Sequence, residues 1–188
     1  VRNTVGGVAR NIAENLARLE VPTILLSAVG RDTTGGRVMR ACENAGIDMS
    51  HVRHIPNANT GMYMALLRAE DSQLHIGVSD FAIVEEHVDS DYLQENESLF
   101  EDAAMVVIDA TLSPETLETL FELTARHDVR VAADPTNPDL AGRLCPYFDR
   151  LYLIVPNAPE TVAMCSPNDP AADDRESALK APRGFVTP

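Results

Sequence analysis

The chain has 188 residues, of which 45% are hydrophobic and 23% are charged, and its formal net charge is −14. This length is sufficient for one α/β domain with a core and too short for two large domains. The net charge is strongly negative and the basic residues, almost all arginine, form no basic stripe of the kind that binds nucleic acid; no apolar run is long enough to span a membrane. We therefore expect a cytoplasmic protein with a small-molecule partner, bound to neither nucleic acid nor membrane.

The first predicted element is an amphipathic helix that begins at the pair Gly6-Gly7. Its apolar positions recur at helical spacing, at Val8, Ile12, Leu16 and Leu19. Backbone N–H groups are unpaired at a helix N-terminus, two glycines let a ligand reach them, and Asn11 offers a donor and an acceptor to hydroxyl groups. The pattern predicts either a polyol-binding helix start or a tight strand-to-helix turn.

A buried strand and a second helix follow along the chain. Pro22 ends the first helix, and residues 23–29 predict the strand. The next helix begins near Asp32 and ends at Gly46. We interpret Asp32 as the cap of this helix and not as a catalytic group, because a carboxylate at a helix start accepts hydrogen bonds from the unpaired amides.

The pattern changes to period-two alternation between residues 51 and 80. The alternating segments are residues 51–56, 60–68 and 73–79. They predict antiparallel hairpins, and an ordinary surface β-meander is the alternative interpretation. We therefore divide the chain into an α/β core, residues 1–50 and 81–188, and a small antiparallel sheet, residues 51–80.

Strands and helices alternate again in the last part of the chain. The predicted strands are residues 104–109, 129–134 and 151–155, and a helix begins at Ser113-Pro114, with serine at the cap and proline at the first helical position. This alternation predicts an α/β fold with a doubly wound, mostly parallel sheet. Asp109, Asp134 and Asn157 lie at the carboxyl ends of these strands, where ligands bind in such folds.

The order and spacing of several segments resembles the ribokinase (PfkB) family of sugar and nucleoside kinases. The resemblance covers most of residues 5–162, and it rests on Gly6-Gly7 with Asn11, residues 27–35, residues 45–52 and Asn157-Ala158-Pro159-Glu160. It implies a ribokinase-like fold in which the antiparallel sheet is a lid, and transfer of phosphate from ATP, with Mg²⁺, to a hydroxyl group. Residues 77–83 look most like the pseudouridine kinase branch, so the expected acceptor is pseudouridine, with ribose, fructose and adenosine as alternatives.

The resemblance also assigns roles to individual residues. Gly6, Gly7 and Asn11 would bind the sugar, and Asp80 would bind a uracil-like base or a ribose hydroxyl. An aspartate that leaves an edge strand is commonly just solvent-facing, so Asp80 keeps that second interpretation. The lid would close over the sugar and expel water, and it would pair two copies of the chain as a homodimer.

Asn157 and Glu160 match the Asn-x-x-Glu segment of the family, which helps to hold magnesium and phosphate, commonly through water. Mg²⁺ prefers oxygen ligands and keeps several waters, which suits an amide and a carboxylate at a strand end. Alternatively, Asn157 caps a helix that opens at Pro159, with Glu160 near the positive end of the helix dipole. Asp134 is either a cofactor-binding residue that acts through the metal or a turn residue, and the turn is favoured.

The sequence departs from the family in two places. The Asp-Thr-x-Gly-Ala-Gly-Asp segment near the end of family members has no counterpart, and neither does the strand before the glycine pair, so the chain looks truncated at both ends. The last aspartate of that segment is the general base that the resemblance would require. No catalytic residue is therefore assigned, and we expect negligible phosphoryl transfer from this chain alone. A non-catalytic sugar- or nucleoside-binding module is the alternative function.

Overall fold

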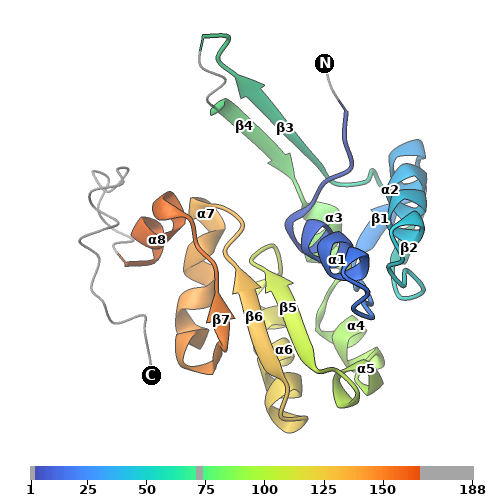
Figure 1. Ribbon diagram of the computed structural model, residues 1–188, viewed down its shortest axis with the longest axis vertical. Coiled ribbons are helices and arrows are strands. Elements are labelled where there is room, and N and C mark those ends of the chain that lie inside the picture. The colour runs from blue at the N-terminus through green and yellow to red at the C-terminus, as the bar shows by residue number, and fades with distance from the viewer. Residues whose placement is uncertain (1–2, 71–73, 166–188) are drawn as a thin grey trace. The chain divides into compact units, whose positions relative to one another are not determined.

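Short parallel strands alternate with helices in the computed structural model, which describes residues 3–70 and 74–165 (Figure 1). The chain divides into two units, Val1–Tyr92 and Leu93–Pro188. Both units combine parallel strands with helices, and the first also carries an antiparallel pair, so the α/β class and the small antiparallel sheet predicted from the sequence are confirmed. Within the described ranges, no helix is both long enough and apolar enough to cross a membrane.

The first unit is built around helices α1 (Val8–Arg18) and α2 (Thr33–Asn44) and the parallel strands β1 (Ala28–Gly30) and β2 (Arg53–Ile55). The strand predicted over residues 23–29 is shorter than expected: before β1, Ile24 forms an isolated bridge with Asp48, and the Ser27 carbonyl accepts from the Arg53 N–H. The core of this part is apolar and contains Ala13, Leu25, Val29, Met39, Cys42, Ile47, Met49 and Val52.

Helix α2 begins and ends at the residues that the sequence indicates. The Asp32 carboxylate accepts a hydrogen bond from the Gly35 N–H at 2.6 Å, which confirms Asp32 as the N-cap. At the other end, Gly46 has a φ of 89°, and the N–H of Ile47 donates to the Cys42 carbonyl at 3.1 Å. This pairing and the left-handed glycine form a Schellman cap, so both boundaries follow from local chemistry.

Strands β3 (Met62–Leu67) and β4 (Leu74–Asp80) form the predicted antiparallel hairpin, with Met62 opposite Asp80. Residues 51–56, expected to belong to the same sheet, instead supply β2, which pairs in parallel with β1. The reason is that the Arg53 N–H donates to the Ser27 carbonyl at 2.9 Å, which extends the β1 ladder. Residue 73, the first of the predicted last segment, lies outside the described residues.

Both faces of the hairpin are exposed, and Figure 1 shows it extending away from the helices of the first unit. One face carries five large apolar side chains, each between 47% and 59% exposed: Met62, Met64, Leu66, Ile76 and Val78. On the other face, the Tyr63 ring lies over Gly77, where an added Cβ would come within 2.7 Å of the tyrosine oxygen. A two-stranded ribbon is only marginally stable by itself in water, and these side chains give it an exposed apolar surface.

Three short helices follow the hairpin, α3 (Ala82–His87), α4 (Ser90–Glu95) and α5 (Ser98–Glu101). Helix α3 contacts β1, and the Arg53 guanidinium lies over the Tyr92 ring, 4.3 Å from its centroid. The Tyr92 hydroxyl donates to the His51 carbonyl. These contacts attach the segment after the hairpin to the parallel strands of the first unit.

The second unit contains a three-stranded parallel sheet in the order β5 (Met105–Asp109), β6 (Arg130–Asp134), β7 (Leu153–Ile154). Its helices are α6 (Pro114–Arg126), α7 (Pro138–Ala141), the 3-10 helix η1 (Gly142–Arg150) and α8 (Ala158–Cys165). Ser113 caps α6 by accepting from the Thr116 N–H at 3.1 Å, as predicted. The Phe121 and Tyr147 rings stack in the core, with centroids 4.3 Å apart.

Candidate functional site

The start of helix α1 combines two exposed glycines with polar side chains. Gly7 is the N-cap residue with a φ of 112°, a conformation that L side chains rarely adopt, so its backbone requires glycine. A Cβ added at Gly6 would meet nothing within 4 Å among the described residues. Packing within the described chain therefore does not require glycine at position 6, and the space beside Gly6 is open to a ligand.

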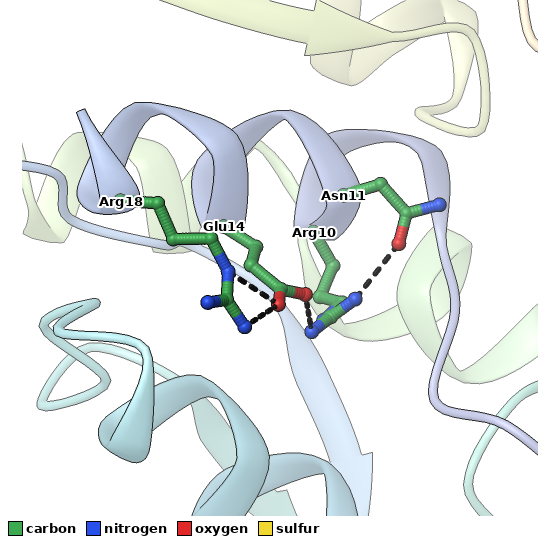
Figure 2. Close-up of polar contacts among 4 residues, drawn as sticks. All are labelled: Arg10, Asn11, Glu14 and Arg18. Atoms are coloured by element: carbon green, nitrogen blue, oxygen red, sulfur yellow. Dashed lines mark hydrogen bonds and ion pairs between the residues drawn. The ribbon is translucent and has the colours of Figure 1, made fainter.

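Asn11 lies one turn into the helix, where four side chains form a continuous polar network (Figure 2). The Arg10 guanidinium donates from Nη1 to Oδ1 of Asn11 at 2.8 Å, and its Nη2 pairs with Glu14. Arg18 also donates to Glu14, at 2.6 Å and 2.9 Å. Hydrogen bonding from Arg18, with the charge of Arg10, lowers the pKa of Glu14, so this carboxylate stays ionised between two arginines.

Asp80 lies at the end of β4 and is exposed. Its Oδ1 accepts a long hydrogen bond, 3.4 Å, from the Ala82 N–H at the start of α3. Within residues 3–70 and 74–165, no hydrogen bond joins Asp80 to the start of α1. The structure therefore does not link Asp80 directly to Gly6, Gly7 or Asn11.

Asp32 has a second role beyond capping α2, because it anchors the chain that leads into the hairpin. Its Oδ2 accepts from the Thr60 N–H at 2.9 Å, and its Oδ1 accepts from the Thr60 hydroxyl at 2.7 Å. These hydrogen bonds, led by that from the Thr60 backbone, lower the pKa of Asp32. A Cβ at Gly30 would lie 2.2 Å from the Ala58 carbonyl oxygen, so the close approach of this loop requires glycine there.

The second group of predicted residues lies in the other unit, at the N-terminus of α8. Asn157 Oδ1 accepts from the Glu160 N–H at 2.9 Å, and Glu160 accepts from the Asn157 backbone N–H at 2.8 Å. The Asn157 Nδ2 also donates to Glu160, at 2.7 Å. This reciprocal pair is a capping box, so the capping interpretation of Asn157 is confirmed, with the helix beginning at Ala158.

Glu160 is only 4% exposed, which is unusual for a carboxylate. Burial raises the pKa of Glu160, the nearby charge of Asp134 raises it further, and the Asn157 N–H opposes both. A cation in this place would relieve the repulsion between the two carboxylates. Each oxygen has lone pairs left for water-mediated contacts, so the residues fit a hydrated Mg²⁺. Among the described residues, however, no group of three acidic, histidine or cysteine side chains is arranged to hold a metal directly.

Asp134 also forms the turn that the sequence favours, since its Oδ1 accepts from the Thr136 N–H at 2.8 Å. Asp109, its neighbour in the sheet register, accepts from the Thr111 N–H at 3.0 Å in the same way. The two threonines were not among the predicted site residues. The signal that would have found them is the repeated Asp-x-Thr pattern after two adjacent strands.

Apart from Asp80, which lies by itself at the end of β4, the predicted site residues fall into two groups, one in each unit. Gly6, Gly7 and Asn11 lie together at the start of α1, and Asp134 and Glu160 interact with each other beside Asn157. The first group can donate and accept hydrogen bonds with a neutral polyol. The second group concentrates oxygen ligands at a sheet edge, which suits a hydrated divalent cation.

Comparisons with known proteins connect both groups to one family. The model of the pfkB family carbohydrate kinases matches residues 1–186. The uncharacterized sugar kinase YeiI of Escherichia coli is 28% identical over 178 residues, which are 95% of this chain and 48% of YeiI. The pseudouridine kinase of Escherichia coli is 29% identical over 157 residues, which are 84% of this chain and 49% of that kinase.

A solved structure shares the fold at lower sequence similarity. A ribokinase II from Escherichia coli, in complex with ATP and Mg²⁺, superposes with a TM-score of 0.72 at 15% identity, covering 98% of this chain and 61% of that one. The chain spans about half the length of the curated relatives that it matches. The resemblance that rests on the glycine pair and the Asn157-to-Glu160 segment is confirmed, and this chain belongs to the pfkB family of carbohydrate kinases.

Proposed function

We propose that the chain is part of a cytoplasmic kinase that transfers a phosphate from ATP to a ribose hydroxyl of a nucleoside, with pseudouridine as the acceptor. The observation that carries this proposal is the similarity to pseudouridine kinase over 84% of the chain. The open glycine pair and the exposed amide of Asn11 at the start of α1 add to it, because they suit a neutral ligand rich in hydroxyl groups.

In this proposal the first unit binds the acceptor. Gly6 and Gly7 let a sugar approach the helix N-terminus, and Asn11 hydrogen-bonds its hydroxyl groups. Asp80 hydrogen-bonds the base or a ribose hydroxyl from the end of β4. The exposed hairpin acts as a lid that keeps water from the transferred phosphate.

The second unit would bind the phosphate side of the reaction. Asn157, Glu160 and Asp134 would hold Mg²⁺ through its water shell, which neutralises charge on the phosphates when the metal and ATP are bound. The support from this chain is the buried Glu160 beside Asp134, an arrangement that a cation stabilises. The solved ribokinase II that contains ATP and Mg²⁺ shares this fold.

The exposed hairpin also supports a homodimer. The five apolar side chains on the Met64 face are too large a group to leave in water on a two-stranded ribbon. A second copy of the same ribbon would cover that face, since pairing of identical surfaces closes a two-fold interface.

Two alternatives follow from specific observations. The 188 residues contain no Gly-Ala-Gly-Asp segment that would supply the general base, which favours a binding module without transfer activity for the chain as given. The similarity to a sugar kinase favours a free sugar, such as ribose or fructose, over a nucleoside as the acceptor.

A ligand-binding experiment with matched variants tests the proposal. Thermal unfolding of the chain is followed with pseudouridine, ribose, fructose and adenosine, because a ligand that binds only the folded state raises its stability. We expect the largest rise with pseudouridine, its loss in Asn11→Ala and its retention in Asn15→Ala, which alters an exposed asparagine of the same helix. No rise with any of the four ligands would contradict the proposed acceptor site.

A transfer assay separates the kinase from the binding module. The chain is incubated with ATP, Mg²⁺ and the ligand that gives the largest rise, and formation of the phosphorylated product is measured. We expect negligible product because the sequence offers no general base. Sustained turnover would show that another residue of this chain takes the proton.

A further inference from the structure

We propose that Arg10 is a positioning residue that fixes the side-chain amide of Asn11, so that Asn11 presents its N–H donors to an oxygen of the ligand. The proposal concerns one contact at the start of α1, the 2.8 Å hydrogen bond from Arg10 Nη1 to Asn11 Oδ1. The identity of the ligand, a ribosyl compound, rests on the proposed function. The orientation of the amide rests on the contact itself.

The contact determines which end of the amide faces the ligand. A guanidinium has donors and no acceptor, so the oxygen of Asn11 must face Arg10, and Nδ2 must face away. Figure 2 shows this arrangement, with the amide nitrogen on the side opposite Arg10. Nδ2 has no hydrogen-bond partner among the described residues, and Asn11 is exposed. Both amide protons are therefore available to an acceptor outside the described chain.

The contact is unusual because neighbouring residues in a helix do not face each other. Arg10 reaches Asn11 only because Glu14, one turn further along, holds the guanidinium against the helix. Glu14 is itself held by Arg18. The Arg10 side chain is 12% exposed, whereas that of Arg18 is 66% exposed, so the network is anchored at its Arg10 end.

Arg10 has an unfavourable position if helix stability is its only purpose. It is the third residue of α1, where the helix dipole and the capping box favour an acidic side chain, and the first turn of α1 contains none. In addition, the Arg10 Nε is buried without a hydrogen-bond partner in the described residues. A residue that breaks two local rules is expected at a functional site.

The arrangement pre-organises the amide before the ligand arrives. A free asparagine amide on a helix surface rotates, and binding then has to immobilise it in one of two orientations. Arg10 removes this requirement and selects the donating orientation. The start of α1 then donates from both its backbone N–H groups and Asn11, which matches the lone pairs of ribose hydroxyl oxygens or a carbonyl oxygen.

Calorimetric titration with pseudouridine, in a double-mutant cycle, tests whether Arg10 affects ligand binding through Asn11. We expect Arg10→Met to weaken binding about tenfold and Asn11→Ala by a similar factor, as for one hydrogen bond to a ligand. The double variant, Arg10→Met with Asn11→Ala, should lose no more affinity than Asn11→Ala alone, because Arg10 acts through Asn11. Arg10→Lys should recover part of the affinity. Additive losses would overturn the proposal, since Arg10 would then act independently of Asn11.

Arg18→Met is the matched control for charge and for contact with Glu14. Arg18 does not contact Asn11, so we expect less than a twofold change in affinity. An equal loss in Arg18→Met and Arg10→Met would overturn the proposal, because the effect would then come from net charge. Circular dichroism of each variant checks that the helical content of the chain is unchanged.

A measurement without ligand separates this inference from the proposed function. The Asn11 Nδ2 protons give their own signals in ¹⁵N NMR, and the order of the amide follows from relaxation. We expect Arg10→Met, and not Arg18→Met, to lower that order. If the wild-type chain binds no ribosyl ligand, the proposed function fails and the NMR result still decides whether Arg10 fixes the amide. If the order is unchanged in Arg10→Met, the positioning role is wrong even if pseudouridine binds.

Discussion

The Thr136 hydroxyl accepts a hydrogen bond from the Ala110 N–H at 2.9 Å and thereby joins the chain after β6 to the chain after β5. Thr136 has a φ of 71°, a left-handed conformation that is rare for a β-branched residue. The N–H of Asn137 donates to the Pro135 carbonyl at 2.8 Å and closes a three-residue turn around it. The strained threonine therefore supports the sheet edge where Asp134 lies.

Two substitutions of Thr136 should separate the contribution of its hydroxyl to stability from the cost of its strained backbone. Thr136→Val keeps the branched shape and removes the acceptor of the fully buried Ala110, so we expect a loss of about 2 kcal/mol. Thr136→Ser keeps the hydroxyl and reduces the strain, so it should be close to wild type in stability. Urea unfolding measures both. Equal stability of the valine and serine variants would show that the hydrogen bond contributes nothing.

Substitution of two adjacent glycines of α2 by alanine should change the stability of the protein in opposite directions. A Cβ at Gly35 would lie 2.2 Å from the Gly30 carbonyl oxygen, so Gly35→Ala forces the backbone apart and should cost about 2 kcal/mol or more. At Gly36 the nearest atom is the flexible end of Arg40, 3.4 Å away, so Gly36→Ala should gain about 0.5–1 kcal/mol from helix propensity. Thermal and urea unfolding of the pair check the two signs.

The pKa of Asp32 gives the stability a pH dependence with a definite sign. Because hydrogen bonds from Thr60 and Gly35 lower its pKa below the ordinary value of 3.8, the folded state releases this proton more readily than the unfolded state. The stabilisation is therefore complete above about pH 5 and is lost as the pH falls through the folded pKa.

The test compares wild type with Asp32→Asn by urea unfolding between about pH 3 and pH 7. The new side-chain amide would set its N–H₂ group against the Thr60 N–H, so the variant should be less stable at neutral pH by about 1 kcal/mol, the usual net contribution of one hydrogen bond. The difference should narrow below about pH 4. A difference that stays constant over the whole range would exclude Asp32 as its source.

The capping box at α8 should be sensitive to loss of either partner. Asn157→Ala removes the cap and leaves the buried Glu160 carboxylate with fewer donors, so we expect a loss of about 1–2 kcal/mol at neutral pH. Because burial raises the pKa of Glu160, its carboxyl is protonated in the folded state at a higher pH than in the unfolded state, and the loss should shrink as the pH falls below the ordinary value of 4.5. Urea unfolding at about pH 4 and pH 8 tests this. A larger loss at the acidic pH would contradict the assignment.

The apolar face of the hairpin should control self-association. Met64→Lys places a charge in the centre of that face and should shift the chain from dimer to monomer in light scattering after size exclusion. Ala65→Lys, on the opposite face of the same strand, is the control and should leave the dimer intact. A wild-type chain that is monomeric at all concentrations would remove the support for the dimer.

Local signals in the sequence predicted the longer helices well. The boundaries of α2 and α6 follow from Asp32, Gly46 and Ser113, because capping depends on residues within one turn. The helices α3, α4 and α5 were not predicted, since four to six residues are too few for periodicity to appear. The pairing of β2 with β1 was missed because strand partners are not encoded in the alternation of one strand.

The candidate site was predictable in residue type and not in contacts. The glycine pair and Asn11 stand out at a predicted helix start, and Asn157 and Glu160 stand out through their resemblance to the Asn-x-x-Glu segment of the family. The Arg10 contact with Asn11 does not, because adjacent helical residues point in different directions and only the three-dimensional position of Glu14 brings them together.

The anchor of Thr60 on Asp32 determines where the hairpin can pivot. The backbone N–H and the hydroxyl of Thr60 both donate to Asp32 at the start of α2, and Gly30 and Gly35 leave no space for this loop to move. Any hinge motion of β3 and β4 relative to the rest of the first unit must therefore occur beyond Thr60, which stays bound to Asp32.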